Sequence, residues 1–169
     1  SHQFIMRFNN QLTNLNLSTV IGSTQASLDI SPSAFCVDKC SGSISLSGWG
    51  GSIINCSNLS GMPVSVGAFQ SSPPNGHDFY LMVLYPNFSG LKYGSYFGGS
   101  LSDEHVDGGT SRINEQGVLF QSVCAGCGGN DDFPVTPGAW PNLGANVKQS
   151  SNCNNGVFKF NYEPRVKSA

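Results

Sequence analysis

The segments FYLMVL (residues 79–84) and LKYGSYFGGS (residues 91–100) decide the fold, because each has an earlier counterpart in the same chain. FYLMVL echoes FIMRFN (4–9), and LKYGSYFGGS echoes LNLSTVIGS (15–23). These are short runs rich in apolar, β-branched and aromatic residues, bounded by turn residues, which is typical of β-strands. The pairs therefore predict a unit built of strands that occurs twice.

Three further segments extend the duplication. RINEQGVLFQSVCAG (112–126) echoes VDKCSGSISLSGWGG (37–51), and FPVTPGAW (133–140) echoes MPVSVGAF (62–69). VFKFN (157–161) then opens a third copy. The spacing between the echoes runs from about 71 to 78 residues, so the loop lengths differ while the strand order is kept. This pattern predicts a tandem β repeat.

The predicted parts are a first unit over residues 1–78, a second unit over 79–155, and the leading strand and tail of a third over 156–169. A four-stranded sheet buries its apolar faces only by stacking on another layer. β-Propellers stack roughly 4–8 such blades around a ring, so two blades cannot close one. We expect an all-β fold of two propeller-type four-stranded repeat units plus one leading strand of a third. A self-contained β-sandwich is the alternative.

Composition excludes several classes of partner. Charged residues make up 11 % of the 169 residues, against about 25 % in typical soluble domains. The net charge of −2 provides no basic field, so no nucleic acid is expected as a partner. No stretch approaches the roughly 20 apolar residues that span a bilayer, so no membrane span is expected. The N-terminus lacks a secretory signal pattern, so either a signal was removed or the chain is an excised piece.

The cysteines favour structural disulfides in an oxidising compartment, outside the cell or at its surface. There are six of them: Cys36, Cys40, Cys56, Cys124, Cys127 and Cys153. The spacing of Cys124 and Cys127 would also suit a thioredoxin-like redox motif, in which the Cys-x-x-Cys pair begins a helix. Here the sequence GGNDDFP follows the pair, and it cannot begin a helix. A zinc site needs about four ligands, and Cys36 and Cys40 are spaced one residue too far for a second Cys-x-x-Cys pair. The sequence does not choose among the pairings.

Two acidic loops are the candidates for a cation. The first contains Asp103, His105 and Asp107, and the second contains Asp131 and Asp132. Both could take Ca²⁺ through carboxylate oxygens, but the order of ligands in an EF-hand loop is missing. A polar loop with an Asp-Gly-Gly turn is the competing interpretation of the first. We therefore expect no cofactor, and Ca²⁺ is the one alternative.

An enzyme is not expected, because no nucleophile elbow Gly-x-Ser-x-Gly is present and no carboxylate pair is marked. Most aromatic residues fall at strand positions where packing between sheets explains them. Trp49 and Trp140 lie near strand ends or in loops, so they are the two candidates for contact with a glycan.

Several motifs resemble a known repeat. YGSYFGGS (93–100), NEQGVLFQ (114–121) and DDFPVTPGAW (131–140) resemble the bacterial SBBP-type β-propeller repeat. That repeat has an aromatic strand ending in Gly-Gly, a hairpin with a Gly-Asn turn, and a DFPTTPGAF-like loop. VDKC (37–40) departs from the usual start of its hairpin. The wider chain, including FNNQLTNLNLSTVIGS (8–23), looks like a segment of very large secreted Bacteroidetes surface proteins that carry a gliding-motility-associated C-terminal domain.

This resemblance implies export by the type IX secretion system and an adhesive or architectural role at the cell surface, without catalysis. Three functions follow as expectations. The first is a structural or adhesive module whose partners are other domains of the same chain or neighbouring copies. The second is a filament subunit, in which the leading strand of one chain completes the open last unit of the next. The third is a module that binds surface glycans.

Overall fold

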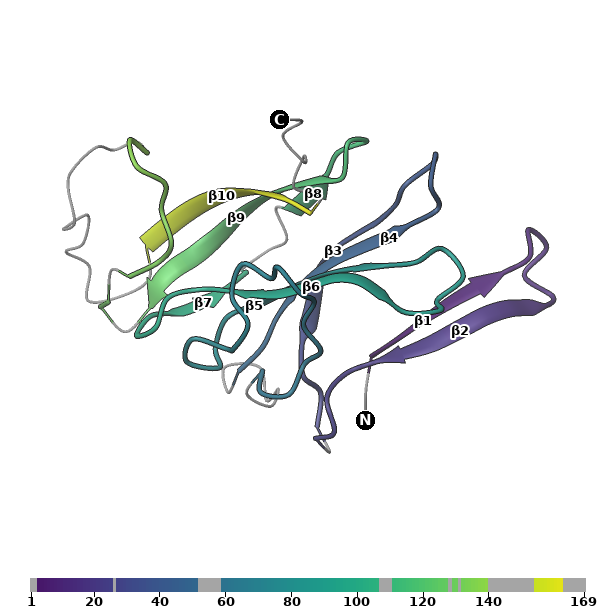
Figure 1. Cartoon of the computed structure of the whole chain (residues 1–169), viewed down its shortest axis with the longest axis horizontal. Helices are drawn as coiled ribbons and strands as arrows, with labels where there is room; N and C mark the ends of the chain where they lie inside the picture. Colours follow the sequence, from purple (N-terminus) through teal and green to yellow (C-terminus); the bar gives the residue numbers. More distant parts are fainter. Residues whose placement is uncertain are drawn as a thin grey trace.

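A computed structural model shows that the protein is all-β, with three antiparallel sheets (Figure 1). It describes residues 3–25, 27–51, 59–106, 111–127, 129–130, 132–139 and 154–162, with the side chain of Cys127 left out. The strands are β1 (Gln3–Phe8), β2 (Leu15–Ile21), β3 (Ser31–Val37), β4 (Ile44–Trp49), β5 (Phe79–Leu84), β6 (Leu91–Phe97), β7 (Asp103–His105), β8 (Ser111–Ile113), β9 (Val118–Cys127) and β10 (Asn154–Asn161). Within these ranges no helix is long and apolar enough to cross a membrane.

Strands β3 to β6 form the central sheet, in which each strand pairs with the next one along the chain. Every residue of β4 and β5 is buried. A strand that is covered on both faces can be apolar throughout, whereas a half-exposed strand alternates. This is why β5 has the continuous apolar sequence FYLMVL.

Strands β7 to β10 form the C-terminal sheet. Strand β9 pairs with β10 along one edge and with both β7 and β8 along the other. Because β7 meets the end of β9 and β8 meets its start, the two short strands act as one interrupted edge strand. A turn over residues 114–117 joins β8 to β9, and its Gly117 has a φ of 72°, a conformation that glycine adopts without strain.

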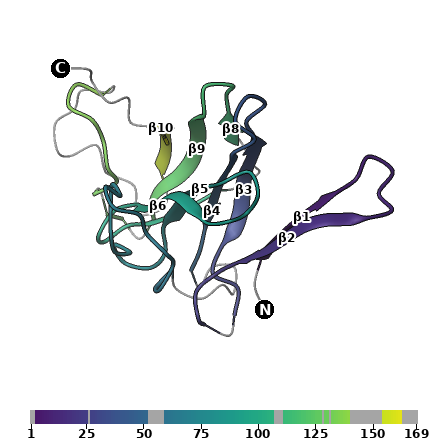
Figure 2. The same ribbon diagram turned by 45° about the vertical axis from the view of Figure 1, so that its right-hand side comes forward.

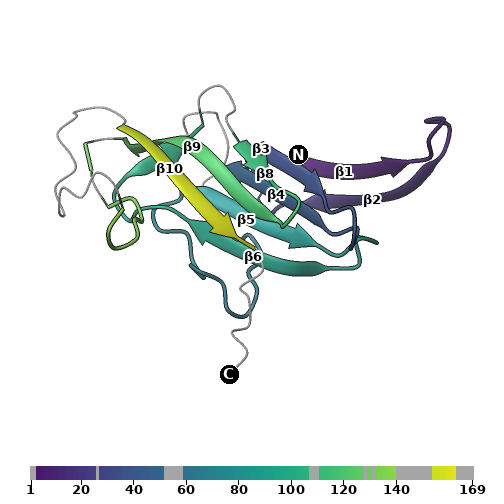
Figure 3. The same ribbon diagram turned by 90° about the horizontal axis from the view of Figure 1, so that it is seen from above.

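The C-terminal sheet lies across one face of the central sheet (Figure 3). The apolar core between them consists of Ala34, Trp49, Phe79, Leu81, Val83 and Phe97 from the central sheet, with Leu119, Val123, Ala125, Phe158 and Tyr162. One polar bridge crosses this core. Ser47 Oγ donates a hydrogen bond to Gln121 Oε1 at 2.9 Å, and Gln121 Nε2 donates to Ser33 Oγ at 2.9 Å. Since the buried amide is paired on both sides, it does not weaken the interface.

The other face of the central sheet is covered by a loop and by the base of the N-terminal hairpin, β1–β2, which projects from the body (Figure 2). The covering residues are Ile5, Ile21, Ile30, Leu59 and Met62. Tyr80 donates a hydrogen bond through its hydroxyl to the carbonyl of Pro63. The same loop continues along the outer edge of β6, where Tyr96 N donates to Gln70 O at 3.1 Å. Both faces of the central sheet are thus occupied.

The prediction of an all-β fold is confirmed. The echoing segments contain strands, except MPVSVGAF (62–69) and FPVTPGAW (133–140), whose described residues form loops. The sheets do not coincide with the predicted units, because the central sheet takes β3 and β4 from before residue 78 and β5 and β6 from after it. Within the described ranges the sheets form no closed ring and no propeller arrangement.

Candidate functional site

One face of the N-terminal hairpin is covered with exposed apolar side chains. Residues directly opposite one another in an antiparallel pair project to the same face, and Phe4 lies opposite Val20 while Phe8 lies opposite Leu15. Met6 lies between them on this face. Phe4 is 63 % exposed and Val20 is 66 % exposed. We call Phe4, Met6, Phe8, Leu15 and Val20 the open face of the hairpin.

The hairpin β5–β6 has the same geometry as the N-terminal hairpin. The register shifts after Arg7 in one and after Val83 in the other. Leu12 and Phe88, in the two turns, both have a φ of 58°, which is uncommon for residues other than glycine. Arg7 therefore corresponds to Val83 and Leu12 to Phe88, each 76 residues further along the chain. The match of these local irregularities supports a duplication independently of the sequence similarity.

The two hairpins differ in how their corresponding faces are covered. Phe4, Met6, Phe8 and Val20 correspond to Tyr80, Met82, Leu84 and Tyr96, respectively. All four counterparts are buried, beneath the loop and the hairpin base that cover the central sheet. The face that is buried in β5–β6 is therefore open in β1–β2.

The structure corrects the sequence alignment of the two leading strands by one residue. The sequence echo set Phe4 against Phe79, whereas the shared register shift sets Phe4 against Tyr80. A slip of one residue moves every side chain of a strand to the opposite face. Only the corrected alignment matches the open face with the buried face.

Strand β10 is a third copy of the leading strand. Leu119 of β9 lies opposite Phe160, as Ile44 of β4 lies opposite Leu84, so Phe160 corresponds to Leu84 at the same spacing of 76 residues. In the central sheet β5 has β6 on its far side. Within the described part of the chain no strand lies on the far side of β10.

A buried pair of carboxyl groups lies at the start of β5. Burial, and then a hydrogen bond with Glu104, raise the pKa of Asp78 to about 9. Asp78 Oδ2 accepts hydrogen bonds from the backbone N–H groups of Asn75 and Gly76. Burial raises the pKa of Glu104 as well, but Glu104 accepts hydrogen bonds from Ser102 Oγ and from the backbone. Asp78 therefore carries the proton of this pair.

The Asp78–Glu104 pair was missed by the sequence reasoning, although a local signal exists. In each unit an acidic residue follows a Gly-Gly or Gly-Ser step and accepts a hydrogen bond from it. Glu104 accepts from Gly99 N at 3.2 Å, and Asp29 accepts from Ser23 N at 2.9 Å. Asp29 and Glu104 thus hold equivalent loops in place, which is a structural role.

The predicted cation ligands that are described lie in separate environments. Asp103 Oδ2 lies 3.3 Å from His77 Nδ1, and the ring of His105 lies 5.4 Å from that of Trp49. Burial opposes ionisation of Asp132, but hydrogen bonds from the Ser100 hydroxyl and from the backbone N–H groups of Leu101 and Ser102 outweigh it and lower its pKa to about 2.

Asp107 and Asp131 lie outside the described residues. Among the residues that are described, no three His, Cys, Asp or Glu side chains are grouped to hold a metal ion.

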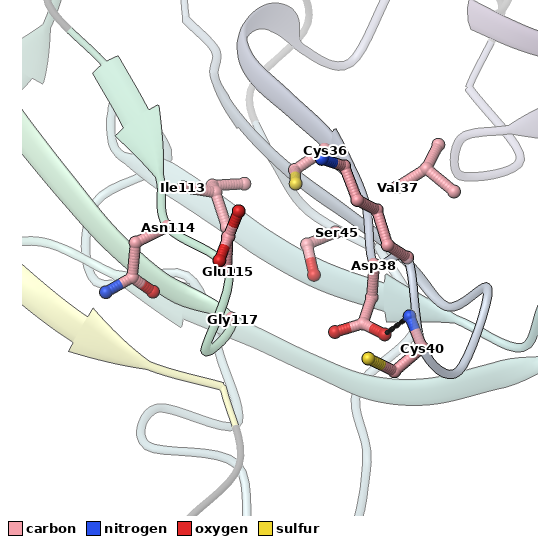
Figure 4. Close-up of a pocket in the computed structure, with 10 residues that line it drawn as sticks. Cys36, Val37, Asp38, Cys40, Ser45, Ile113, Asn114, Glu115 and Gly117 are labelled. Carbon is pink, nitrogen blue, oxygen red and sulfur yellow. Dashed lines mark hydrogen bonds between the residues drawn. The ribbon is translucent and has the colours of Figure 1, made fainter.

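A pocket of about 310 Å³ lies between the tips of two hairpins, β3–β4 and β8–β9 (Figure 4). Cys36, Asp38 and Cys40 line one side, and Glu115 lies across from them. Asp38 is already used within its turn, since its Oδ1 accepts a hydrogen bond from Cys40 N at 2.9 Å. The pocket therefore follows from the spacing of two adjacent turns, and the carboxylate of Asp38 stabilises one of these turns.

The predicted disulfides are not seen where the structure can show them. Cys36 is half-buried, Cys40 is exposed, and both carry free thiols. Cys124 is half-buried on β9, opposite Asn155. In the part of the chain that the structure describes, no disulfide is formed.

Cys56 and Cys153 lie outside the described residues, as does the side chain of Cys127. Crosslinks that involve these three cysteines stay a prediction.

The two tryptophans proposed for glycan contact do not form a site in the described structure. Trp49 is only 6 % exposed and belongs to the core between the two four-stranded sheets. Its ring faces therefore pack inside the protein. Trp140 lies outside the described residues.

The chain was compared with known proteins in three ways, and no family model, no curated protein and no solved structure matches it.

Proposed function

We propose that this chain is a non-catalytic structural module of a large extracellular surface protein, built of two β repeat units and the leading strand of a third. The observation that carries the proposal is the recurrence of one hairpin geometry at a spacing of 76 residues, with the same face covered in one copy and open in the other. In stacked repeat proteins each repeat contacts its neighbours and the outermost repeats carry a polar outer face, so an open apolar face indicates a missing neighbour.

The direction of stacking supports this proposal. Ile5 and Ile21 are buried and face the central sheet. Their counterparts, Leu81 and Phe97, are buried and face the C-terminal sheet. Each hairpin therefore turns the same face toward the sheet that follows it along the chain. Because the hairpins share this orientation, further units could be stacked at either end in the same way.

The location at the cell surface rests on composition and resemblance. Few charged residues and an even number of cysteines suit an exported protein, and the motifs resemble repeats of secreted surface proteins. An adhesive role would use the open face of the hairpin, because large exposed apolar patches mark interaction sites.

A fusion tests the stacking. Residues 29–78 placed directly ahead of Gln3 would supply a β3–β4 hairpin to pair with β1 and a copy of the loop that covers β5–β6 in the central sheet. We expect the amide hydrogens of β1 and β2 to exchange at least tenfold more slowly in the fusion than in the original chain, because the open face becomes buried. Hydrogen exchange read by mass spectrometry measures this.

A substitution provides the matched control. Met6→Ser should be nearly neutral in the original chain, where Met6 is 45 % exposed. In the fusion it should cost about 2 kcal/mol, because Met6 takes the buried place of Met82. Unchanged exchange in β1 and β2, together with equal costs of Met6→Ser in both proteins, would contradict the proposal.

The filament subunit is the second candidate function, and one observation favours it. Both β1 and β10 are edge strands with no strand beside their outer edge in the described part of the chain. An unpaired edge is a template for pairing with another chain. Head-to-tail pairing of β10 in one copy with β1 in the next would not close, and it would give a fibre.

Sedimentation velocity tests this candidate. The expected result is a series of oligomers that lengthens with protein concentration. Met6→Lys, which places a charge on the edge strand, should shorten the series. Leu12→Lys, at the exposed tip of the same hairpin, should leave it unchanged. A monomer at every concentration would rule the filament out.

A further inference from the structure

We infer that the free edge of β10 and the loop that follows β9 form a site for one added β-strand, and that this strand carries glycine where the loop crosses it. The inference rests on the proposed function and names the neighbour that the module takes at its C-terminal end. It follows from how β6 is held in the central sheet, and from copies of both neighbours of β6 in the C-terminal sheet.

In the central sheet β6 is held between two elements. One edge pairs with β5, and the loop over residues 63–70 runs along the other. Ser65 N donates a hydrogen bond to the carbonyl oxygen of Gly94 at 3.1 Å, and Gly94 N donates to Ser65 Oγ at 3.2 Å. The loop therefore occupies backbone groups that an edge strand would leave unpaired.

The loop approaches β6 this closely because residue 94 is glycine. A Cβ atom on Gly94 would lie 2.7 Å from the carbonyl oxygen of Pro63, 2.7 Å from Leu91 Cδ2 and 2.9 Å from the Tyr80 hydroxyl. The Leu91 side chain could turn away, whereas the carbonyl group belongs to the backbone of the loop. The contact between this loop and the strand therefore requires glycine.

Both neighbours of β6 have copies in the C-terminal sheet. Strand β10 corresponds to β5, and FPVTPGA (133–139) echoes MPVSVGA (62–68). In each loop the alanine N–H donates to the carbonyl oxygen three residues earlier, at 3.1 Å to Ser65 and at 3.0 Å to Thr136. The glycine before this alanine has a φ of 80° in the first loop and 78° in the second. The two loops thus contain the same turn.

The two loops also begin against equivalent side chains. Met62 belongs to the same buried cluster as Met82 of β5. Phe133 takes the place of Met62, and its ring centroid lies 6.2 Å from that of Phe158, which corresponds to Met82. Within the described residues, no counterpart of β6 lies beside β10. The strand is missing, while the two elements that would hold it are present.

The second loop keeps the groups that select glycine. Pro134 takes the place of Pro63, and Thr136 keeps the hydroxyl group of the serine. Gly156 takes the place of Tyr80, so no tyrosine hydroxyl contributes here. The carbonyl group of the loop is then the one that excludes a Cβ atom on the added strand.

A second copy of this chain is a poorer occupant of the site. Its β2 corresponds to β6, but Met6 pairs with Ser18 where Met82 pairs with Gly94. The Cβ atom of Ser18 would meet the carbonyl group of the loop. The occupant is therefore a strand of the β6 type, which a following repeat would supply.

An inserted strand tests the inference. A copy of residues 87–100 placed directly after Tyr162 would supply the turn and the strand that follow β5 in the central sheet. We expect the amide hydrogens of β10 to exchange at least tenfold more slowly than in the original chain, because its free edge becomes paired. Hydrogen exchange read by mass spectrometry measures this.

Three substitutions examine the role of the loop. Gly94→Val in the inserted copy should remove most of the protection of β10. Lys92→Val in the inserted copy is the matched control, since it adds the same side chain at an exposed position on the same face of the strand, and it should keep the protection. Thr136→Val should weaken the protection with the insert and leave the original chain unchanged.

The outcomes are distinguishable from those of the proposed function. If the insert leaves β10 unprotected while the N-terminal fusion protects β1 and β2, the inference is wrong and the stacking stands. If neither protein shows protection, both are wrong. Equal protection with Gly94→Val and with Lys92→Val would show that the loop does not close the site, and would overturn the inference. Protection of β10 that rises with the concentration of the original chain would make a second copy the occupant, and would overturn it as well.

Discussion

Replacing Phe97 by alanine is expected to lower the free energy of unfolding by about 3–5 kcal/mol, a large part of the roughly 5–15 kcal/mol that keeps a domain folded. Phe97 is 6 % exposed, and its ring centroid lies 4.5 Å from that of Phe158. The rings of Phe69, Phe133 and Phe160 lie within 6 Å of it as well. Alanine would remove the centre of this group and leave a cavity between the two sheets.

Urea denaturation followed by tryptophan fluorescence measures the effect, since Trp49 lies in the same core. Phe35→Ala is the matched control. Phe35 is 55 % exposed on β3, so its replacement should cost less than about 1 kcal/mol. Similar midpoints for the two variants would show that the aromatic group between the sheets does not hold them together.

Stability is expected to fall as the pH rises from about 4 to about 9, and Asp78→Asn is expected to remove most of this dependence. The pKa of Asp78 is raised from 3.8 to about 9 by burial and by its hydrogen bond with Glu104. The folded protein therefore keeps a proton that the unfolded chain has already lost. The stabilisation is fully present below pH 4 and is lost as the pH rises toward 9, by up to about 1.4 kcal/mol per pH unit. Asparagine keeps the size of the side chain and does not titrate.

Urea midpoints between pH 5 and pH 9 test this prediction. Asp38→Asn is the control, because hydrogen bonds within its own turn, chiefly from Ser41, lower the pKa of Asp38. Asp38 stays ionised across this range, so its replacement should leave the slope unchanged. A wild-type protein equally stable at pH 5 and pH 9 would contradict the protonated pair.

The strands could be predicted from the sequence because their signals are local. FYLMVL is a continuous apolar run bounded by turn residues, and it forms β5 over the residues expected. Asn114 and Gly117 mark the turn before β9, where a glycine in the left-handed region is required. The pairing partners of these strands could not be predicted in the same way. Nothing in a strand sequence shows that β4 pairs across the predicted unit boundary with β5.

The register of the duplication was one residue off for a physical reason. Both QFIMRF and FIMRFN match FYLMVL in composition, so similarity alone does not choose between them. The choice is made by the turns, where Leu12 and Phe88 share a left-handed backbone, and by the register shift beside them. These are properties of the folded backbone, and no residue type marks them.

The candidate sites were the least predictable part. Asp78 and Glu104 are 26 positions apart in the sequence and meet only because β7 begins beside the start of β5, where Glu104 N donates to His77 O. Trp49 was expected at a surface and is buried, because the C-terminal sheet covers the end of β4. The acidic loop residues were only weak candidates for a cation, and Asp103, His105 and Asp132 each contact different partners.

The central sheet contains strands from both predicted units. This arrangement affects how the number of repeats in such a chain can change. A gene duplication that inserts one more stretch of 76 residues would add one complete sheet in the interior, while the N-terminal hairpin and the C-terminal sheet would stay as they are. Proteins with different numbers of repeats could therefore arise by duplication without any change to the first or last sheet. Natural selection would then act only on the length of the repeat array.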